Sequence, residues 1–341
     1  MEPKEKKKLT YQDFVPENEV KWCPGCGDYS ILAQVQRVLP ELGLEREKFV
    51  CVSGIGCSSR FPYYMNTYGF HGIHGRAAAI ATGLKVSRPD LSIWVATGDG
   101  DMMSIGGNHF IHACRKNVDL NILLFNNRIY GLTKGQYSPT SQKGMITKTS
   151  PYGVVDHPFK PIALAIGSGA TFVARSIDRE PKHMQEMIKK AGEHKGLSFV
   201  EIYQNCVIFN DGEYSKLTDK DSRDDNLLVL EDKKPMIFGK GKDKGIKLVN
   251  FKPVVIDLNK KENSIEDVLI HDETDESSMR AIMLACMIED HKLPTPIGIF
   301  RRVQKSTYDG DVNLQLHEVT KKYGKGDLNT LLNGGNTWEI K

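Results

Sequence analysis

The sequence predicts an α/β fold in which helices flank a mostly parallel β-sheet. Between Trp22 and Cys206, short apolar or β-branched runs alternate with segments of helical periodicity, which is the pattern of a parallel sheet with crossover helices. The chain has 341 residues, 40% of them hydrophobic, which is enough for a sizeable buried core. No apolar stretch approaches the roughly 18 residues needed to cross a bilayer, so no membrane association is expected.

Five strands and five helices follow from these patterns. The expected strands are the apolar runs at 49–53, 91–97, 120–125, 170–174 and 198–203. The expected helices are 30–39, 76–86, 106–115, 181–191 and, ahead of the apolar PTPIGIF segment, 276–288. Crossovers between parallel strands are right-handed, and successive strands are usually neighbours. The strands at 91–97 and 120–125 should therefore end side by side at one edge of the sheet.

Composition divides the chain into three parts. Residues 1–10 contain four Lys and two Glu without an apolar pattern, which is typical of a flexible, solvated lead-in. Residues 11–225 carry the strand and helix patterns and form the expected main domain. After about Asp225 the sequence becomes rich in Lys, Gly and other polar residues, so 226–341 is expected to be a C-terminal extension.

Charge and cysteine content narrow the class of protein. The 46 basic and 43 acidic residues leave a net charge of +3, too small for a mechanism based on nonspecific attraction to nucleic acid. The basic N-terminal residues are not followed by the apolar stretch of an export signal, so a cytoplasmic protein is expected. In that setting the seven cysteines indicate thiol chemistry or metal binding and not a disulfide framework.

Polar residues follow two neighbouring strands of the expected sheet. The Gly98-Asp99-Gly100 turn follows the first strand, and Asn126 and Asn127 follow the second. Ligands of α/β sheets bind at this edge. A carboxylate and a neutral amide oxygen are hard ligands that suit Mg²⁺ and leave room for diphosphate oxygens. Either turn alone is commonplace, but their separation and placement favour a metal site.

Four cysteines have the spacing of a metal centre. Cys23 and Cys26 form a C-x2-C pair, Cys57 lies in a glycine-rich turn, and Cys206 follows the last predicted strand of the main domain. Thiolates from three separate loops are compatible with one [4Fe-4S] cluster, and zinc remains an alternative. The other three cysteines lie in apolar strand or helix text and are expected to be small buried hydrophobic residues. They are Cys51, Cys114 and Cys286.

Five motifs follow one another along the chain: WCPGCGDYSIL, GIGCSSRFPYY, HGIHGRAAAIATGLK, GDGDMMSIGGNHF and NNRIYGLTKGQYSPTS. In this order they resemble the β subunit of the 2-oxoacid:ferredoxin oxidoreductases. The likeness is dense from Lys21 to Asp211 and looser in the C-terminal segments HDE, PTPIGIFR and TYD. It implies a diphosphate-binding domain that carries thiamine diphosphate, Mg²⁺ and a [4Fe-4S] cluster.

The resemblance also assigns residues. It implies that Asp99, Asn127 and the backbone carbonyl of Ile129 hold Mg²⁺. The cluster ligands would be Cys23, Cys26, Cys57 and Cys206. The implied thiamine diphosphate contacts are Ile55, Gly56, Ser58, His74, Gly100, Asp101, Gly131 and Leu132. Because Cys57 lies between two of these contacts, coenzyme and cluster are expected to be close together.

The implied reaction is the oxidative decarboxylation of a 2-oxoacid to acyl-CoA, with coenzyme A as co-substrate and ferredoxin as electron acceptor. Thiamine enzymes also need a glutamate against the aminopyrimidine ring, and this chain is too short to hold a second domain that presents it. The resemblance therefore implies no catalytic side chain in this chain. An α subunit, or α and γ subunits, is expected to supply the glutamate.

The substrate is less sharply defined by the sequence. Arg60, three residues after Cys57, would pair with the distal carboxylate of 2-oxoglutarate and favour it over pyruvate. An ordinary surface arginine, with pyruvate or broad 2-oxoacid specificity, is the alternative. A non-redox thiamine decarboxylase would not need the four cysteines. A metal-stabilised nucleic-acid module would rest on the C-x2-C pair and the Lys-rich stretch 233–247, which lacks interleaved aromatic residues.

Overall fold

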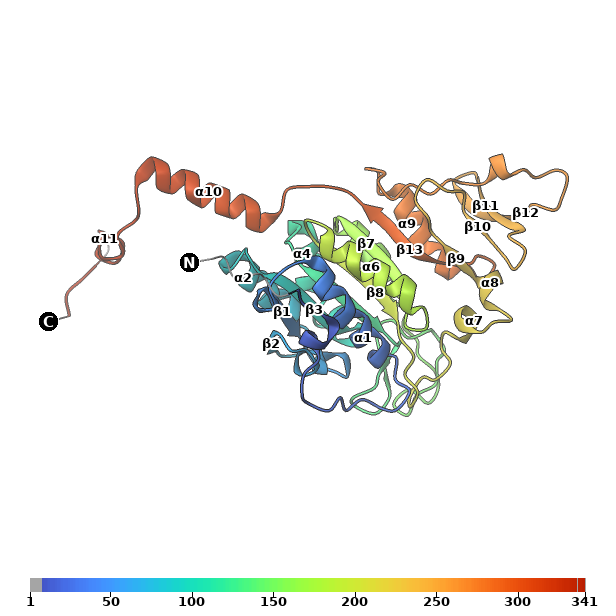
Figure 1. Ribbon diagram of the computed structural model, residues 1–341, viewed down its shortest axis with the longest axis horizontal. Coiled ribbons are helices and arrows are strands. Elements are labelled where there is room, and N and C mark those ends of the chain that lie inside the picture. Colours follow the sequence, from blue (N-terminus) through green and yellow to red (C-terminus); the bar gives the residue numbers. More distant parts are fainter. Residues whose placement is uncertain (1–7, 336, 341) are drawn as a thin grey trace.

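An eight-stranded sheet forms the centre of the computed structural model, which describes residues 8–335 and 337–340 (Figure 1). The strand order is β2-β1-β3-β4-β8-β7-β13-β9. The strands are β1 Phe49–Ser53, β2 Tyr68–His71, β3 Ser92–Gly98, β4 Asn121–Asn126, β7 Phe172–Ile177, β8 Ser198–Tyr203, β9 Leu227–Val229 and β13 Thr295–Arg302. From β2 to β7 every neighbouring pair is parallel, whereas β13 is antiparallel to β7 and parallel to β9. The predicted mostly parallel α/β fold is confirmed.

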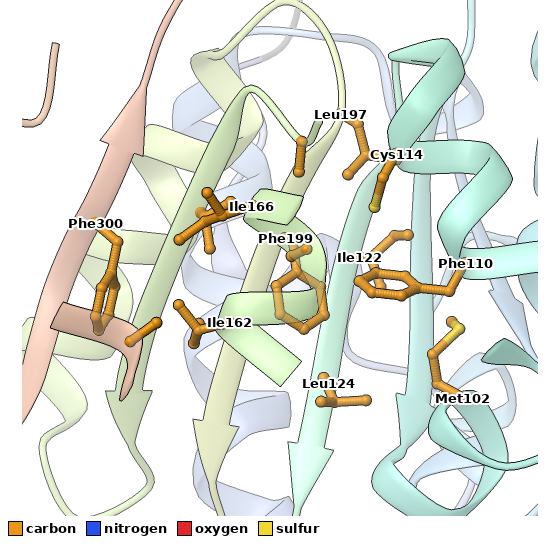
Figure 2. Packing of buried hydrophobic residues seen from close by; sticks show 14 of the residues in the cluster. Met102, Phe110, Cys114, Ile122, Leu124, Ile162, Ile166, Leu197, Phe199 and Phe300 are labelled. Carbon is orange, nitrogen blue, oxygen red and sulfur yellow. The ribbon is translucent and has the colours of Figure 1, made fainter. Parts of the chain in front are cut away.

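Helices cover both faces of the sheet because the central strands are apolar on both sides. One face packs against α1 (Asp28–Val38) and α6 (Pro181–Glu193), with Val35 and Ile188 among the buried residues. The other face packs against α2 (Ala77–Ser87), α4 (Gly107–Lys116) and α5 (Pro161–Gly167). Figure 2 shows this second core, in which Phe110 of α4 lies against Ile122 and Phe199 of the sheet. The two cores fix the strand ends at which the polar motifs lie.

The elements after residue 225 form a smaller sheet and then return to the main one. A three-stranded antiparallel sheet comprises β10 Ile237–Phe238, β11 Lys244–Val249 and β12 Lys252–Asp257. Two short helices, α7 Ser215–Thr218 and α8 Arg223–Asn226, lead into this part, and its own helices are α9 Met279–Cys286, α10 Tyr308–Tyr323 and α11 Leu328–Leu332. In Figure 1, α10 and α11 lead away from the body of the molecule. The expected extension therefore contributes β9 and β13 to the main sheet, which the sequence did not predict.

Short elements complete the chain. The two-stranded sheet is formed by β5 Ile129–Tyr130 and β6 Gln136–Tyr137, and α3 covers Asp99–Met103. The 3-10 helices are η1 Tyr11–Phe14, η2 Leu39–Leu42, η3 Arg46–Lys48, η4 Ser58–Tyr64, η5 Ile265–Asp267 and η6 Met287–Glu289. No helix among the described residues is long and apolar enough to span a membrane.

The five predicted strands and the predicted helices lie where the sequence placed them, with small shifts at their ends. Strand 49–53 is β1, and helix 276–288 is α9 followed by η6. The GDGD segment differs, because Asp99 begins a short helix where a turn was predicted. Of the predicted lead-in 1–10, residues 1–7 lie outside the described residues, and the first element begins at Tyr11.

Candidate functional site

A cavity of about 490 Å³ opens at the carboxyl ends of β1, β3 and β4. Because β1, β3 and β4 are parallel neighbours, the segments that follow them meet at one edge of the sheet. All eleven residues that the sequence analysis assigned to the coenzyme and to Mg²⁺ line this cavity: Ile55, Gly56, Ser58, His74, Asp99, Gly100, Asp101, Asn127, Ile129, Gly131 and Leu132. The structure thus brings together residues that are up to 77 positions apart in the sequence.

Asp99 lies in the wall of this cavity as a buried carboxylate. Its Oδ2 accepts hydrogen bonds from the hydroxyls of Ser138 and Thr140, each at 2.5 Å. Burial raises the pKa of the Asp99 carboxyl above its usual range. No lysine or arginine among the described residues lines the cavity. A buried carboxylate without a basic side chain beside it fits a bound cation that supplies the missing charge.

Of the two asparagines at the carboxyl end of β4, Asn127 is the one that lines the cavity. Its Nδ2 donates to Gln204 Oε1 at 2.9 Å, which fixes the amide orientation, and its Oδ1 accepts from the backbone amide of Ile129 at 3.1 Å. Asn126 does not line the cavity: its Nδ2 donates to the buried Glu201 at 2.7 Å, and its Oδ1 lies 3.0 Å from the Thr140 hydroxyl that also bonds Asp99. The oxygen-rich group around Asp99 and Asn127 fits a hard cation such as Mg²⁺.

Asp101 organises the cavity wall through its side chain. Its Oδ1 accepts from the backbone amides of Ile55 and Gly75 at 3.0 and 2.7 Å and lies 2.9 Å from His74 Nδ1. Its Oδ2 accepts from Thr97 at 2.8 Å. Both carboxylate oxygens therefore bind protein groups, so any contact between Asp101 and a diphosphate would fall to its backbone. Sequence reasoning missed this organising role.

Gly100 is needed because an aromatic ring lies directly over its Cα. The Tyr130 hydroxyl donates to the Gly100 carbonyl at 2.8 Å, and a Cβ at position 100 would lie 2.3 Å from the Tyr130 ring. Real Cβ atoms essentially never make such a contact. The glycine therefore allows Tyr130 to lie against the start of α3, where it lines the cavity beside Asp99.

The four cysteines with cluster spacing line a second cavity, of about 220 Å³. A Cβ at Gly131 would lie 3.6 Å from the Sγ atoms of both Cys57 and Cys206, so these two thiols face the same backbone. Cys26 Sγ accepts a hydrogen bond from Gln204 Nε2 at 3.3 Å, and Cys23 is exposed at the rim. Cys51 and Cys114 are buried in the apolar cores, as predicted for small hydrophobic residues, and Cys286 is half-buried.

Burial raises the pKa of the Cys57 thiol to about 12 and raises that of Cys26 as well, in both cases mainly by removing the thiolate from water. These groups would therefore ionise only with a metal in place of the proton. Within the described part of the chain, no three His, Cys, Asp or Glu side chains are gathered closely enough for a single metal ion. The four thiols around this cavity are groups that could hold a thiolate-ligated metal centre.

The two cavities share a wall. Six residues line both of them: Asp28, Cys57, Asn127, Gly131, Leu132 and Gln204. Asp28 is fully buried, its Oδ1 has no hydrogen-bond partner, and burial raises the pKa of its carboxyl to about 7. The sequence analysis did not single out Asp28, because its burial between two cavities arises only when α1 packs against the sheet.

Arg60 lies at the second cavity and not at the first. Its side chain is exposed, and Nη1 donates to the backbone carbonyl of Lys21 at 2.7 Å.

Sequence reasoning missed four further residues of the site: Ser138, Thr140, Gln204 and Tyr130. The only available signal was that they fall within or near motifs already chosen for other residues. No glutamate in the described part of the chain lines the first cavity.

Comparison with known proteins gives a consistent set of relatives. Residues 54–202 match the family model of the thiamine pyrophosphate enzyme C-terminal TPP binding domain. The chain is 46% identical over 331 residues to the 2-oxoglutarate oxidoreductase subunit KorB of Mycobacterium tuberculosis, covering 96% of this chain and 88% of that protein. It is 47% identical over 201 residues to the 2-oxoacid:ferredoxin oxidoreductase subunit β of Saccharolobus solfataricus, covering 58% of this chain and 66% of the relative.

A solved structure also resembles the whole chain. It is the 2-oxoglutarate:ferredoxin oxidoreductase from Magnetococcus marinus with 2-oxoglutarate, coenzyme A and succinyl-CoA bound. The TM-score is 0.73 at 34% sequence identity, and the match covers 97% of each chain. The likeness therefore includes the elements after residue 225 as well as the cavity-bearing sheet.

Proposed function

Because this chain belongs to the family of 2-oxoacid:ferredoxin oxidoreductase β subunits, we propose that it is the coenzyme-bearing subunit of a CoA-dependent 2-oxoglutarate:ferredoxin oxidoreductase. The first cavity would hold thiamine diphosphate and Mg²⁺, and the second a [4Fe-4S] cluster. The observation that carries the proposal is the wall shared by the two cavities, in which Cys57 lies between Gly56 and Ser58, two of the proposed coenzyme contacts.

The residues of this chain would bind and orient the reacting groups. Thiamine diphosphate, when bound, supplies the electron sink for loss of CO2 from the 2-oxoacid. Asp99, Asn127 and the carbonyl of Ile129 would hold Mg²⁺ against the diphosphate. Ile55 and Leu132 contribute apolar surface to the same cavity and, once a partner subunit covers them, would exclude water from the reacting carbon. Electrons would pass over a short distance toward ferredoxin, through the adjoining second cavity.

A partner subunit is part of the proposal. The described lining of the first cavity supplies carboxylates only from Asp28, Asp99 and Asp101, so the activating glutamate would come from an α subunit, or from α and γ subunits together. Coenzyme A would take the acyl group, and ferredoxin would take the electrons. Nucleic acid has no place in this scheme.

The proposed substrate is 2-oxoglutarate because the relatives that match nearly the whole chain carry that name. Arg60 is the proposed partner of its distal carboxylate, although it lines the second cavity and would have to turn toward the first to reach the substrate. The guanidinium is exposed and donates to one backbone carbonyl, so it can exchange partners. In Arg60→Ile, we expect the ratio of 2-oxoglutarate to pyruvate turnover to fall. An unchanged ratio would remove Arg60 from the proposal and leave broad or pyruvate specificity as the alternative.

The decisive experiment is anaerobic copurification with the partner, followed by iron, sulfide and thiamine analysis and a panel of 2-oxoacids. We expect thiamine, iron and sulfide in the proportions of one coenzyme and one [4Fe-4S] cluster per β chain. We also expect CoA-dependent ferredoxin reduction that is fastest with 2-oxoglutarate. A colourless, iron-free complex that still binds thiamine diphosphate would instead indicate a non-redox thiamine enzyme.

A further inference from the structure

Arg128 occupies an unusual position between the two predicted metal ligands Asn127 and Ile129. Its backbone has a φ of +57°, in the left-handed region that a bulky side chain rarely adopts. Such a conformation persists only where surrounding contacts hold it in place. The turn brings the Asn127 side-chain oxygen within 3.1 Å of the Ile129 amide and leaves both residues in the wall of the first cavity.

Contacts from β8 and the segment that follows it hold the Arg128 side chain, whereas Ser141 Oγ donates to the Arg128 backbone carbonyl at 2.6 Å. Its Nη1 donates to Glu213 Oε1 at 2.6 Å, and both side chains are more than four-fifths buried. The guanidinium lies over the rings of Tyr203 and Tyr214, at 5.7 and 5.1 Å from their centroids. These two rings are themselves stacked at 4.2 Å. The guanidinium is thus already paired and enclosed, so it is a structural anchor and not a free anion-binding group.

The same segment carries Cys206 and is hydrogen-bonded along its length to the asparagine turn. The backbone amide of Gln204 donates to the backbone carbonyl of Asn126 at 3.0 Å, and Asn210 Nδ2 donates to the backbone carbonyl of Asn127 at 2.9 Å. The Tyr214 hydroxyl donates to the Asn126 carbonyl at 3.0 Å. Through Arg128, Asn210, Glu213 and Tyr214, the loop of one predicted cluster ligand is thus joined to the turn of two predicted Mg²⁺ ligands.

We propose that Arg128, through Glu213, is a positioning residue that couples the Mg²⁺–thiamine diphosphate site to the iron-sulfur site. This inference rests on the proposed function. Opening of residues 204–214 would release the asparagine turn, and opening of the turn would release the loop of Cys206. Binding at either site therefore suppresses the opening that exposes the other, and linkage requires this effect to be reciprocal.

The test uses the anaerobically copurified complex with its partner subunit. Thiamine diphosphate and Mg²⁺ are removed with EDTA, and the apparent Mg²⁺ dissociation constant is measured by equilibrium dialysis of thiamine diphosphate. Release of iron to a chelator is then followed with and without the coenzyme. Arg128→Gly is the main variant, because glycine adopts a positive φ without strain, so the turn can be kept while the whole side chain with its guanidinium is lost. Glu213→Gln is the second variant, which leaves the backbone of the turn unchanged.

In wild type, Mg²⁺ with thiamine diphosphate should slow iron release about fivefold or more. In Arg128→Gly, the apparent Mg²⁺ dissociation constant should rise about 10–100-fold, and the protection of iron should disappear. Glu213→Gln should change both in the same direction. The matched control is Glu41→Gln, which breaks an exposed 2.8 Å ion pair with Lys189, lines neither cavity and should change neither quantity.

Wild-type Mg²⁺ affinity and wild-type iron protection in both variants would overturn the inference. A loss of Mg²⁺ affinity with iron protection intact would overturn the coupling as well, since Arg128 would then act on one site alone. A wild-type complex that contains neither iron nor a Mg²⁺-dependent thiamine site would overturn the proposed function itself, and the inference with it.

Discussion

At the scale of single residues, the Asp99 carboxylate depends on groups that lie about 40 positions away in the sequence. Ser138 and Thr140 reach it because β5 and β6 pair as a hairpin after the asparagine turn. Two hydroxyl donors on Oδ2 restrict the rotation of the carboxylate. Groups that orient a metal ligand in this way typically change metal affinity by 10–100-fold when they are lost.

Thr140→Val should therefore weaken Mg²⁺ binding by about 10–100-fold while leaving the fold intact, because valine has the shape of threonine without its hydroxyl. The measurement is the Mg²⁺ dependence of thiamine diphosphate binding in the copurified complex. Thr140→Ser keeps the donor and should bind Mg²⁺ nearly as well as wild type. Equal affinities for the valine and serine variants would show that the hydroxyl does not orient Asp99.

The cysteines offer a second comparison between single residues. Cys57 lines the second cavity, whereas Cys286 is a half-buried cysteine that lines neither cavity. Cys57→Ser should lose most of the bound iron, because serine is a poor substitute for a thiolate ligand. Cys286→Ser should keep it. Iron analysis and the visible absorption of anaerobic protein decide the matter, and equal iron contents would contradict the assignment of Cys57.

At the scale of elements, apolar runs identified the central strands because each of them is buried on both faces. All five residues of β1 are buried, which is the pattern that the sequence analysis used. The helix at Asp99–Met103 was not predicted, since its five residues are too few to show helical periodicity and two glycines adjoin or lie within it. The hydroxyl pair at Ser138 and Thr140 was likewise invisible, because hairpin pairing and not sequence spacing brings it to Asp99.

Helix α6 contacts the sheet through His183, and we expect this contact to depend on pH. His183 Nδ1 lies 2.8 Å from Ser176 Oγ of β7, and burial lowers the pKa of the imidazole from 6.5 to about 4. The folded state therefore holds His183 neutral, whereas the unfolded state binds a proton below pH 6.5. The contribution of the neutral His183 to the free energy of unfolding is complete above pH 6.5. That free energy should fall by roughly 2–3 kcal/mol as the pH drops to about 4.

Urea unfolding of the isolated chain at a series of pH values measures this slope. His183→Asn should make the dependence between pH 4 and 6.5 shallower, whatever its effect on the stability at neutral pH, while His194, whose pKa burial also lowers to about 4, keeps its share of the slope. His317→Asn, at an exposed position on α10, should leave the slope as it is in wild type. A His183→Asn profile parallel to that of wild type would mean that this imidazole does not carry the acid sensitivity.

At the scale of the whole molecule, the cavity edge was predictable and the course of the C-terminal third was not. Asp99 and Asn127 could be placed together because the neighbourhood of successive parallel strands follows a topological rule. No such rule predicts that β13 returns from residue 295 to lie antiparallel to β7. Nor does a single sequence show which cavity Arg60 lines, because that depends on how the 3-10 helix η4 (Ser58–Tyr64) directs the side chain.

The first cavity also predicts what the chain does without its partner. The described lining holds no glutamate, and Ile55 and Leu132 at the cavity are 37% and 52% exposed. A site that is neither activated nor sealed from water lacks two contributions to thiamine catalysis.

The isolated chain, loaded with thiamine diphosphate, Mg²⁺ and iron, should therefore show no steady CoA-dependent ferredoxin reduction, and adding the partner subunit should restore it. Coenzyme and iron content are measured on the same sample, so that a missing cofactor is not mistaken for a missing partner. Sustained turnover by the loaded single chain would refute the requirement for a second subunit.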